Sequence, residues 1–429
     1  MSTQYRFIEK VNEADFNKLA FKDGVKSHFL GSKQWGKVSE KRGWTVHYVG
    51  MEKDGQLAAT ALLLQKPLFF GYSYFYIPRG FTMDYRDREL LKEFTNEIDK
   101  YCKKHKSIYF KIDPDIKLHT IDLDGNVIEG EDNYDLVEYL KSIGFKHKPL
   151  NYYFEGEQPR FTFRIPLEDD IEEIEKKYSR TTKSRIKQAK KYGVEVVKGT
   201  REDVDEFCRL MTMTEKRKDF FSHKDDFYHF FYDLFEEEDM VTLYLGVVDI
   251  PKIADKLEND IANLKEELTK YEGNENKRAI NKCKEINKQI VALEKQQANI
   301  ADKPREKVVA SAYLITNYDD KAWALYAGND MNYGKFFANY AVYEKQIQDA
   351  KEKGLKIFDV FGTIGKPDGD SKLVGLYEFK KKWGGEYIEF IGEFEYIENR
   401  IMHFAYKTLI PYYHKIVNKR LRKKVKNGN

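Results

Sequence analysis

The chain has 429 residues, of which 34% are charged and 15% aromatic, and its net charge is only +3. The aromatic content excludes a disordered chain, which lacks the apolar surface that offsets ordering entropy, and the small net charge excludes a uniformly basic nucleic-acid binder. Three widely spaced cysteines exclude a disulfide framework or a CxxC site. No leader or membrane-spanning run is visible, so we expect a cytoplasmic protein of about two or three domains.

The first part of the chain predicts strands, then a helix, then another strand. Segments 44–49, 56–65 and 69–77 are rich in β-branched and aromatic residues, which is typical of strands. Apolar side chains recur at helical spacing in 87–104, and 107–112 again has the composition of a strand.

The same order returns in the second part of the chain. Strands at 308–316 and 321–326 precede a helix at 336–353 and a strand at 355–361. Two helices and a strand are predicted ahead of this group, at 202–213, 225–235 and 241–248. Two mixed α/β units of similar plan indicate a structural duplication, although no convincing sequence repeat is visible.

Residues 251–304 follow a different pattern. Their apolar side chains alternate at spacings of three and four residues, the a/d pattern of a coiled coil, first in 254–271 and again in 279–300. A polar break at 273–276 separates the two runs. We therefore expect an antiparallel helical hairpin inserted in the second unit, with arms about 30 Å long. A single disordered linker, the alternative, would not keep this register.

Two stretches carry many cations and no acid: 176–191 holds eight Lys and Arg residues, and 415–429 holds seven. A solvated helix face and a frayed terminus are the alternatives. Because acids are abundant elsewhere, their absence here indicates a large anionic partner.

Motifs of several catalytic classes are missing. The nine histidines form no HExxH or Cys/His cluster, and no G-x-S-x-G, Walker A or GxGxxG sequence occurs. No metal site and no cofactor are therefore predicted.

What remains is a series of polar motifs beside aromatic strands. In chain order they are Phe29…Trp35…Val38, Pro78-Arg79-Gly80, Lys111-Ile-Asp113-Pro114, Ser179-Arg180…Ile186…Ala189…Gly193, Met211…Thr214…Arg217…Phe220 and Gly375-Leu…Phe379-Lys380…Trp383-Gly384. This ordered set resembles the Fem/MurM (FemABX) family of peptidoglycan peptidyltransferases, over about residues 28–396.

The resemblance implies an α/β (α+β) fold of two tandem acetyltransferase-like (GNAT) domains. The expected boundaries are 1–165 for the first domain, 166–250 with 305–395 for the second, 251–304 for the inserted hairpin, and 396–429 for a C-terminal helix packed on the first domain. Family members with such a hairpin are usually linked to lipid II.

The implied reaction moves Gly, Ala or Ser from aminoacyl-tRNA to the stem-peptide amine of a precursor, lipid II or UDP-MurNAc-pentapeptide, and so extends the interpeptide bridge. The ester is already activated, so neither ATP nor a metal is needed. The enzyme must position two anionic substrates, stabilise an oxyanion and let the attacking ammonium lose its proton.

By matching motif positions, Lys37 and Arg217 resemble the family's cationic pair on the precursor phosphates, which suits both side chains. Arg79 of the P-R-G turn is placed with them among the substrate-binding residues. Phe221 stands where relatives can carry Tyr, which puts a hydroxyl contact there in doubt, and Tyr326 is a weaker candidate for a substrate hydrogen bond.

Lys380 matches the family's essential lysine and is assigned to the developing oxyanion or to the tRNA acceptor end, against the alternative of a surface lysine. Asp113, at the end of a strand on the cleft edge, is the candidate acceptor of the amine proton. Its alternatives are an Asp-Pro turn, or a proton shuttled by the terminal ribose hydroxyl of tRNA.

The basic helix is the expected tRNA-binding surface, with the hairpin beside it as a rigid arm. Its contacts are predicted at Arg180, Lys183, Arg185, Lys187, Lys190 and Lys191. The basic tail and the amphipathic segment 401–413 would hold the enzyme at anionic lipid, at the inner face of the cell membrane. Oligomeric state is not predicted.

Two other functions would each explain part of the sequence. An acyl-CoA-dependent N-acyltransferase needs a Q/R-x-x-G-x-G/A loop that cradles a pyrophosphate, and the matching stretch 329–335 has a single glycine. A coiled-coil RNA-binding or scaffold protein explains the hairpin and the basic runs, but not the ordered polar motifs.

Overall fold

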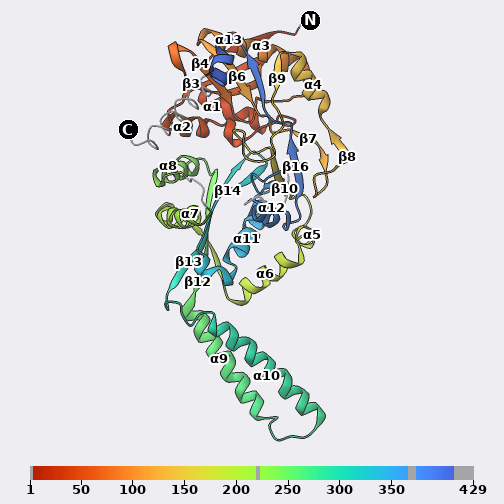
Figure 1. Ribbon diagram of the computed structural model, residues 1–429, viewed down its shortest axis with the longest axis vertical. Coiled ribbons are helices and arrows are strands. Elements are labelled where there is room, and N and C mark those ends of the chain that lie inside the picture. Colours follow the sequence, from red (N-terminus) through yellow and green to blue (C-terminus); the bar gives the residue numbers. More distant parts are fainter. Residues whose placement is uncertain (1–2, 219–222, 366–372, 410–429) are drawn as a thin grey trace, which may run out of the picture.

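The computed structural model describes residues 3–218, 223–365 and 373–409. Two mixed sheets follow one another along the long axis, each flanked by helices, and a helical hairpin projects from the second at the end opposite the N-terminus (Figure 1). Among these residues, no helix combines the length and the apolar character needed to cross a membrane.

The first sheet has the strand order β1-β2-β3-β4-β6-β17-β9, with β5 paired to β3. Its strands are β1 (Tyr5–Ile8), β2 (Thr45–Lys53), β3 (Gln56–Pro67), β4 (Ser73–Ile77), β5 (Thr82–Met83), β6 (Ser107–Ile112), β9 (Phe145–His147) and β17 (Phe394–Ile397). Strand β6 runs parallel to β4 and follows helix α3 (Arg88–Lys104). Helix α3 begins at the cap Asp87, and its buried Leu90, Phe94 and Ile98 pack against the sheet. Helices α1 (Glu13–Phe16), α2 (Lys33–Lys41) and α4 (Tyr134–Ser142) complete this unit.

The second sheet has the order β11-β12-β13-β14-β15-β10-β16-β7-β8. Its strands are β7 (Lys117–Ile121), β8 (Val127–Asp132), β10 (Phe161–Pro166), β11 (Glu195–Gly199), β12 (Val241–Asp249), β13 (Lys307–Tyr318), β14 (Lys321–Asn329), β15 (Ile357–Asp359) and β16 (Glu386–Phe390). Strand β15 runs parallel to β14 and follows helix α11 (Ala338–Glu352). The other helices of this unit are α5 (Ile171–Lys176), α6 (Arg180–Lys191), α7 (Val204–Lys218), α8 (Asp225–Glu236) and α12 (Val374–Lys381).

The duplicated plan expected from the sequence is confirmed. In each unit three antiparallel strands (β2-β3-β4 and β12-β13-β14) lead through a long helix to a strand parallel to the third one. The fold is therefore a tandem of two acetyltransferase-like units.

Strand pairing crosses the domain boundaries expected from the sequence. Strands β7 and β8, and all of β10 except Pro166, belong to the expected first domain 1–165 but pair in the second sheet. Strand β17, which crosses the end of the expected range 305–395, returns to the first sheet. In each sheet a strand that is distant in the sequence pairs with the outer edge of the parallel strand. That edge would otherwise leave its backbone N–H and C=O groups unpaired. Composition predicts a strand but not its neighbour.

After β17, helix α13 (Arg400–Phe404) and a π-helical turn (Ala405–Leu409) lie against β6. The remainder of the expected C-terminal helix, 410–429, lies outside the described residues.

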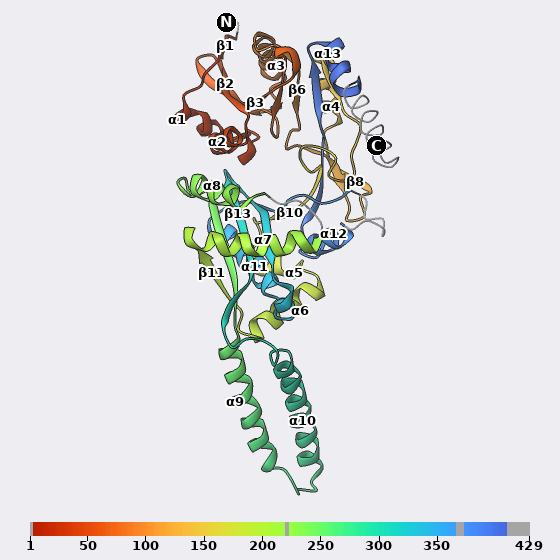
Figure 2. The ribbon, with the colours of Figure 1, turned by 60° about the vertical axis from the view of Figure 1, so that its left-hand side comes forward.

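The inserted hairpin is confirmed as well. Helices α9 (Ile250–Thr269) and α10 (Lys277–Ala298) pack against each other through Ile261, Ile286 and Ile290 (Figure 2). The base of α9 shares a core cluster with Phe336 of the second unit, so the hairpin is anchored on that unit.

One hydrophobic cluster joins the two units. It combines Trp35 of α2 and Tyr76 of β4 with Leu314 and Trp323 of the second sheet and with helices α7 and α8. Burial of this continuous cluster fixes the units relative to each other.

Candidate active site between the two units

Asp113 lies directly after β6, at the end of the sheet that faces the second unit. Its Oδ2 accepts a hydrogen bond from the Tyr76 hydroxyl (2.9 Å), and its Oδ1 accepts one from the Arg79 backbone N–H (2.7 Å). The residue is only 4% exposed, so it lies deeper than the cleft-edge position expected from the sequence. Burial raises the pKa of the Asp113 carboxyl to about 7, although the nearby Arg79 charge and these hydrogen bonds act to lower it.

Arg79 occupies the turn that follows β4, and its own backbone is left-handed (φ 57°). The guanidinium Nη2 donates to the Pro159 carbonyl (3.0 Å) and lies 4.6 Å from the centre of the Phe390 ring. A Cβ on the next residue, Gly80, would lie 2.4 Å from the Tyr85 hydroxyl, so the turn requires glycine there. The P-R-G motif thus builds the tight turn that delivers an N–H to Asp113.

Lys380 projects from α12 and is only 8% exposed. Its Nζ donates to the carbonyls of Phe361 and Gly362, the latter at 2.7 Å. Phe361 is left-handed (φ 53°), and its N–H donates to Asp359 Oδ1 (2.8 Å). The burial of Lys380 contradicts the alternative of a surface lysine, and its charge is directed at one loop of the second unit.

The loop that holds Lys380 also meets the Arg79 turn. A Cβ on Gly362 would lie 2.6 Å from Pro159, the residue whose carbonyl binds Arg79. A chain of direct contacts therefore runs from Asp113 through Arg79 and Pro159 to the carbonyls around Lys380. The structure gathers these three predicted residues at the junction of the two units.

A buried ion network locks this junction. Arg164 of β10 binds Asp115 of the first unit (2.5 Å) and Asp359 of the second (2.8 Å), and Thr162 also donates to Asp359 (2.6 Å). The Phe390 ring contacts both the Arg79 and the Arg164 guanidinium groups. Arg164 keeps the pKa of the buried Asp115 carboxyl low despite its desolvation, so Asp115 is an anion at neutral pH.

The remaining substrate-binding candidates lie around α8. Tyr326 of β14 packs edge-on against Tyr228 of α8, and burial raises its pKa. Lys37 lies one helical turn from both Lys33, which pairs with Glu238 (3.8 Å), and Lys41, which contacts the Phe230 ring. Lys37 therefore shares the face of α2 that is turned toward α8.

Arg217 is exposed at the end of α7, one turn beyond Thr214, whose hydroxyl accepts a hydrogen bond from the Asn329 N–H (3.0 Å). Neither Lys37 nor Arg217 forms an ion pair with a residue that the structure describes, and no contact joins the two. Phe221 lies outside the described residues.

The predicted tRNA-binding cations on α6 divide into two groups. Arg185 lies over the Phe337 ring (4.1 Å), Lys190 pairs with Glu344 (2.8 Å), and Lys183 donates to a backbone carbonyl (2.9 Å). Arg180, Lys187 and Lys191 are exposed and form no ion pair within the described part of the chain. A depression of about 460 Å³ is lined by Lys183, Lys187 and Lys190 but also by Glu172 and Glu175, so the surface is less uniformly cationic than its sequence.

The segment that would carry a CoA pyrophosphate is filled by side chains. After β14 the chain forms a 3₁₀ helix (Met331–Phe336) that buries Tyr333 and Phe336. Arg185 covers Phe337 at the start of α11. This packing disfavours an open phosphate cradle at that position.

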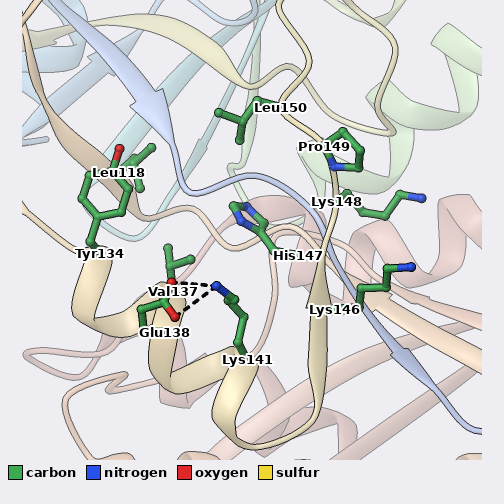
Figure 3. A pocket seen from close by; sticks show the side chains of 10 residues that line it. All are labelled: Leu118, Tyr134, Val137, Glu138, Lys141, Lys146, His147, Lys148, Pro149 and Leu150. Carbon is green, nitrogen blue, oxygen red and sulfur yellow. Dashed lines mark hydrogen bonds and ion pairs between the residues drawn. The ribbon is translucent and has the colours of Figure 1, made fainter.

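A cavity of about 580 Å³ lies beside α4 in the first unit, lined by apolar side chains such as Leu118, Val137 and Leu150 and by charged ones such as Glu138 and Lys141 (Figure 3). Lys146 and Lys148 point away from the His147 ring (Figure 3). None of the predicted site residues lines this cavity, and it is not the candidate active site.

Sequence reasoning missed Tyr76, Arg164 and Asp359. Tyr76 stands two residues before the Pro-Arg-Gly turn, and Asp359 lies in the strand predicted at 355–361, so both had a positional signal. Arg164 had none, because its role depends on β10 joining the second sheet. No group of three or more possible metal-ligating side chains occurs among residues 3–218, 223–365 and 373–409.

Comparisons with known proteins agree with this architecture. A family model described as "FemAB family" matches residues 12–410. The lipid II:glycine glycyltransferase of Staphylococcus haemolyticus is 28% identical over 418 residues, covering 94% of this chain and 96% of its own. That of Staphylococcus aureus is 27% identical over 427 residues, with the same coverage. The crystal structure of FemX superposes with a TM-score of 0.78 at 25% identity, over 94% of this chain and 99% of FemX.

Proposed function

Because the chain belongs to the FemAB family, we propose that it is an aminoacyltransferase that moves an amino acid, glycine in the first instance, from aminoacyl-tRNA to the stem-peptide amine of lipid II. The observation that carries the proposal is that relatives named for lipid II:glycine transfer align over 94% of the chain. The buried polar junction described above supplies residues for each chemical step.

The amine nitrogen attacks the ester carbonyl carbon, a C–N bond forms, and the C–O bond to the tRNA ribose breaks. The attacking ammonium must first lose a proton, and Asp113 is the proposed acceptor. Its pKa of about 7 suits a group that has to take up a proton at neutral pH and release it again. Arg79 and Tyr76 orient this carboxylate by hydrogen bonds.

Lys380 is proposed to stabilise negative charge on the carbonyl oxygen or to hold the tRNA acceptor end. Its ammonium is fixed by two backbone carbonyls in a water-poor position, where a charge acts strongly on a developing oxyanion. Lys37 and Arg217, on helices α2 and α7, are proposed to bind the precursor diphosphate. Tyr326, which packs on α8, is proposed as a further contact.

One assay tests the whole proposal. Purified full-length protein is incubated with glycyl-, alanyl- or seryl-tRNA and with lipid II or UDP-MurNAc-pentapeptide, and products are identified by mass. We expect a mass increase of one residue on lipid II with glycyl-tRNA. An acetyl-CoA arm tests the rival N-acyltransferase. Transfer from acetyl-CoA alone, or no transfer from any aminoacyl-tRNA, would refute the proposal.

A further inference from the structure

Several large apolar side chains are exposed on two neighbouring segments at the outer end of the first unit. Phe70 is 89% exposed, Ile401 80%, Phe404 57% and Leu409 51%. Phe70 lies in the turn between β3 and β4, and the other three lie on the helical segment 400–409. We call this set the apolar face. Monomeric proteins seldom expose such side chains as a group unless they bind a partner or a membrane.

Ring contacts place the turn and the helical segment side by side. The Phe69 ring lies 5.5 Å from Phe70 and 6.4 Å from Tyr406. Tyr406 in turn packs on Tyr74 of β4 (6.0 Å) and on Tyr109 of β6 (6.3 Å). The helical segment is therefore pinned to the sheet by one side, while Ile401 and Phe404, three residues apart, share the opposite side.

The turn itself holds an aromatic ring in an unusual backbone conformation. Phe70 has φ 56° and is followed by Gly71 at φ 76°. A left-handed conformation is rare for a bulky residue and costs free energy. This cost is not offset by burial of Phe70 in the protein, because the side chain stays in solvent.

Exposed cations flank the apolar face, and two nearby acids are neutralised. Lys106, whose carbonyl binds the Ser73 N–H beside the turn (3.0 Å), and Arg400 are exposed and form no ion pair with a described residue. Glu395 is bound by Lys148, His403 and Lys407. Burial raises the pKa of Glu398 to about 8, so this side chain is largely neutral at pH 7. Beyond Leu409, the sequence 415–429 adds seven cations and no acid.

We propose that the apolar face docks on an anionic lipid bilayer, with the Phe70, Ile401 and Phe404 side chains at the level of the headgroup–acyl boundary. Exposed aromatic and aliphatic groups ringed by Lys and Arg are the features that bind such a surface. The choice of a bilayer over a protein partner rests on the lipid-linked acceptor of the proposed function.

The apolar face lies on the same unit as Asp113 and Lys37. Strand β4, five residues or about 16 Å long, separates the Phe70 turn from the Arg79 turn beside Asp113. The hairpin projects from the opposite end of the molecule, away from the docked surface (Figure 1).

Vesicle flotation with the full-length protein tests the inference in the absence of tRNA and precursor. Wild type should bind phosphatidylglycerol-containing vesicles and bind neutral phosphatidylcholine vesicles less. The variant Phe70→Ser/Ile401→Ser/Phe404→Ser should bind about tenfold more weakly or worse, because three apolar side chains no longer enter the bilayer. The matched control Ile280→Ser/Val291→Ser removes exposed apolar groups from the hairpin and should bind like wild type.

Equal binding of the triple variant and wild type would overturn the inference. So would a wild-type self-association that the triple variant abolishes, without vesicle binding, because it would assign the face to a second copy of the chain. Transfer assays keep this test distinct from the proposed function. The triple variant should retain transfer to lipid II in detergent and lose it on lipid II in vesicles. Failure of the wild type to transfer to lipid II in either form would refute the proposed function alone.

Discussion

At the scale of single residues, the decisive feature is how completely the two proposed catalytic side chains are enclosed. Asp113 and Lys380 are both nearly buried, and both are held by backbone groups of left-handed residues, Arg79 and Phe361. Such backbone positions persist only where the surrounding structure determines them, and they concentrate at functional sites.

Asp113 should make the reaction and the stability depend on pH. Its pKa is about 7 in the folded chain against 3.8 for a free carboxyl, so between these values the native state binds the extra proton. Stability contributed by this proton is present at low pH and is lost as pH rises through about 7. Asp113→Asn should remove that loss, so its gain in unfolding free energy over wild type should grow between about pH 4 and 7.

The same residue should set the pH–rate profile of transfer. We expect the wild-type rate to rise with pH to a plateau above about 7, and Asp113→Asn to lower it about 100-fold or more. Tyr76→Phe removes a hydrogen bond that stabilises the carboxylate, so it should move the profile to higher pH while keeping the plateau. An unshifted profile in Tyr76→Phe, or a fully active Asp113→Asn, would exclude Asp113 as the base.

Lys380→Met keeps the apolar stem but removes the charge. We expect kcat to fall about 100-fold, as when an oxyanion donor is removed, and stability to fall by about 1–3 kcal/mol because two buried carbonyls are left without their donor. The neighbour Lys381 pairs with Asp124 (3.1 Å) and is more exposed, so Lys381→Met is the matched control and should stay active. A wild-type kcat in Lys380→Met would leave Lys380 a structural residue only.

At the scale of elements, α6 and the hairpin are the two candidates for the tRNA surface, and the packing of each limits which residues are available. Helix α6 buries Thr182, Ile186 and Ala189, which orients its other side to solvent. The hairpin buries its a/d seam and stands free beyond its base.

Charge reversal at Arg180, Lys187 and Lys191 should weaken tRNA binding and flatten its salt dependence, by about one unit of slope for each phosphate that is no longer neutralised. Lys176 and Lys177 are already paired with Glu173 and Asp169, so their reversal serves as the control for added negative charge. Fluorescence titration over a range of salt concentrations measures both. An unchanged slope in the first variant would remove α6 from the tRNA surface.

Shortening the hairpin tests the arm without disturbing its anchor. Ile261 packs with Ile290, so joining residue 260 to 291 through a short Gly-Ser turn removes the outer part and keeps the base cluster. We expect an unchanged melting temperature, unchanged precursor binding and weaker tRNA binding. Full tRNA affinity and turnover in this variant would favour a role of the arm in partner binding or self-association.

At the scale of the whole molecule, the candidate site depends on contacts between the two units. The shared hydrophobic cluster brings α2 of the first unit against α8 of the second, and Arg164 binds carboxylates from both units. Neither unit by itself carries a complete set of the proposed residues.

The precursor site follows from this arrangement, since Lys37 comes from one unit and Arg217 from the other. Lys37→Ala and Arg217→Ala should each weaken precursor binding by about 1.5–3 kcal/mol, the value of a charge-assisted hydrogen bond, and leave tRNA affinity unchanged. Lys216→Ala, beside Arg217 on the exposed end of α7, is the control. Calorimetry with precursor and with tRNA separates the two effects, and equal losses for both ligands would contradict the assignment.

The sequence by itself determined the elements and several of the proposed site residues. Helix α3, strand β6 and the hairpin lie within a few residues of their predicted bounds, because apolar periodicity and capping are local properties of the chain. Lys380, Asp113 and Arg79 were identified through ordered motifs, and the structure places them around one junction.

Only the tertiary structure decided which strands pair and what surrounds each site residue. The exchange of β10 and β17 between the expected domains, and with it the Asp115–Arg164–Asp359 network, depends on groups that are far apart in sequence. The raised pKa of Asp113 likewise comes from its burial in the folded chain. Strand composition does not specify a partner strand, because a sheet edge accepts any segment that satisfies its hydrogen bonds and buries its apolar face.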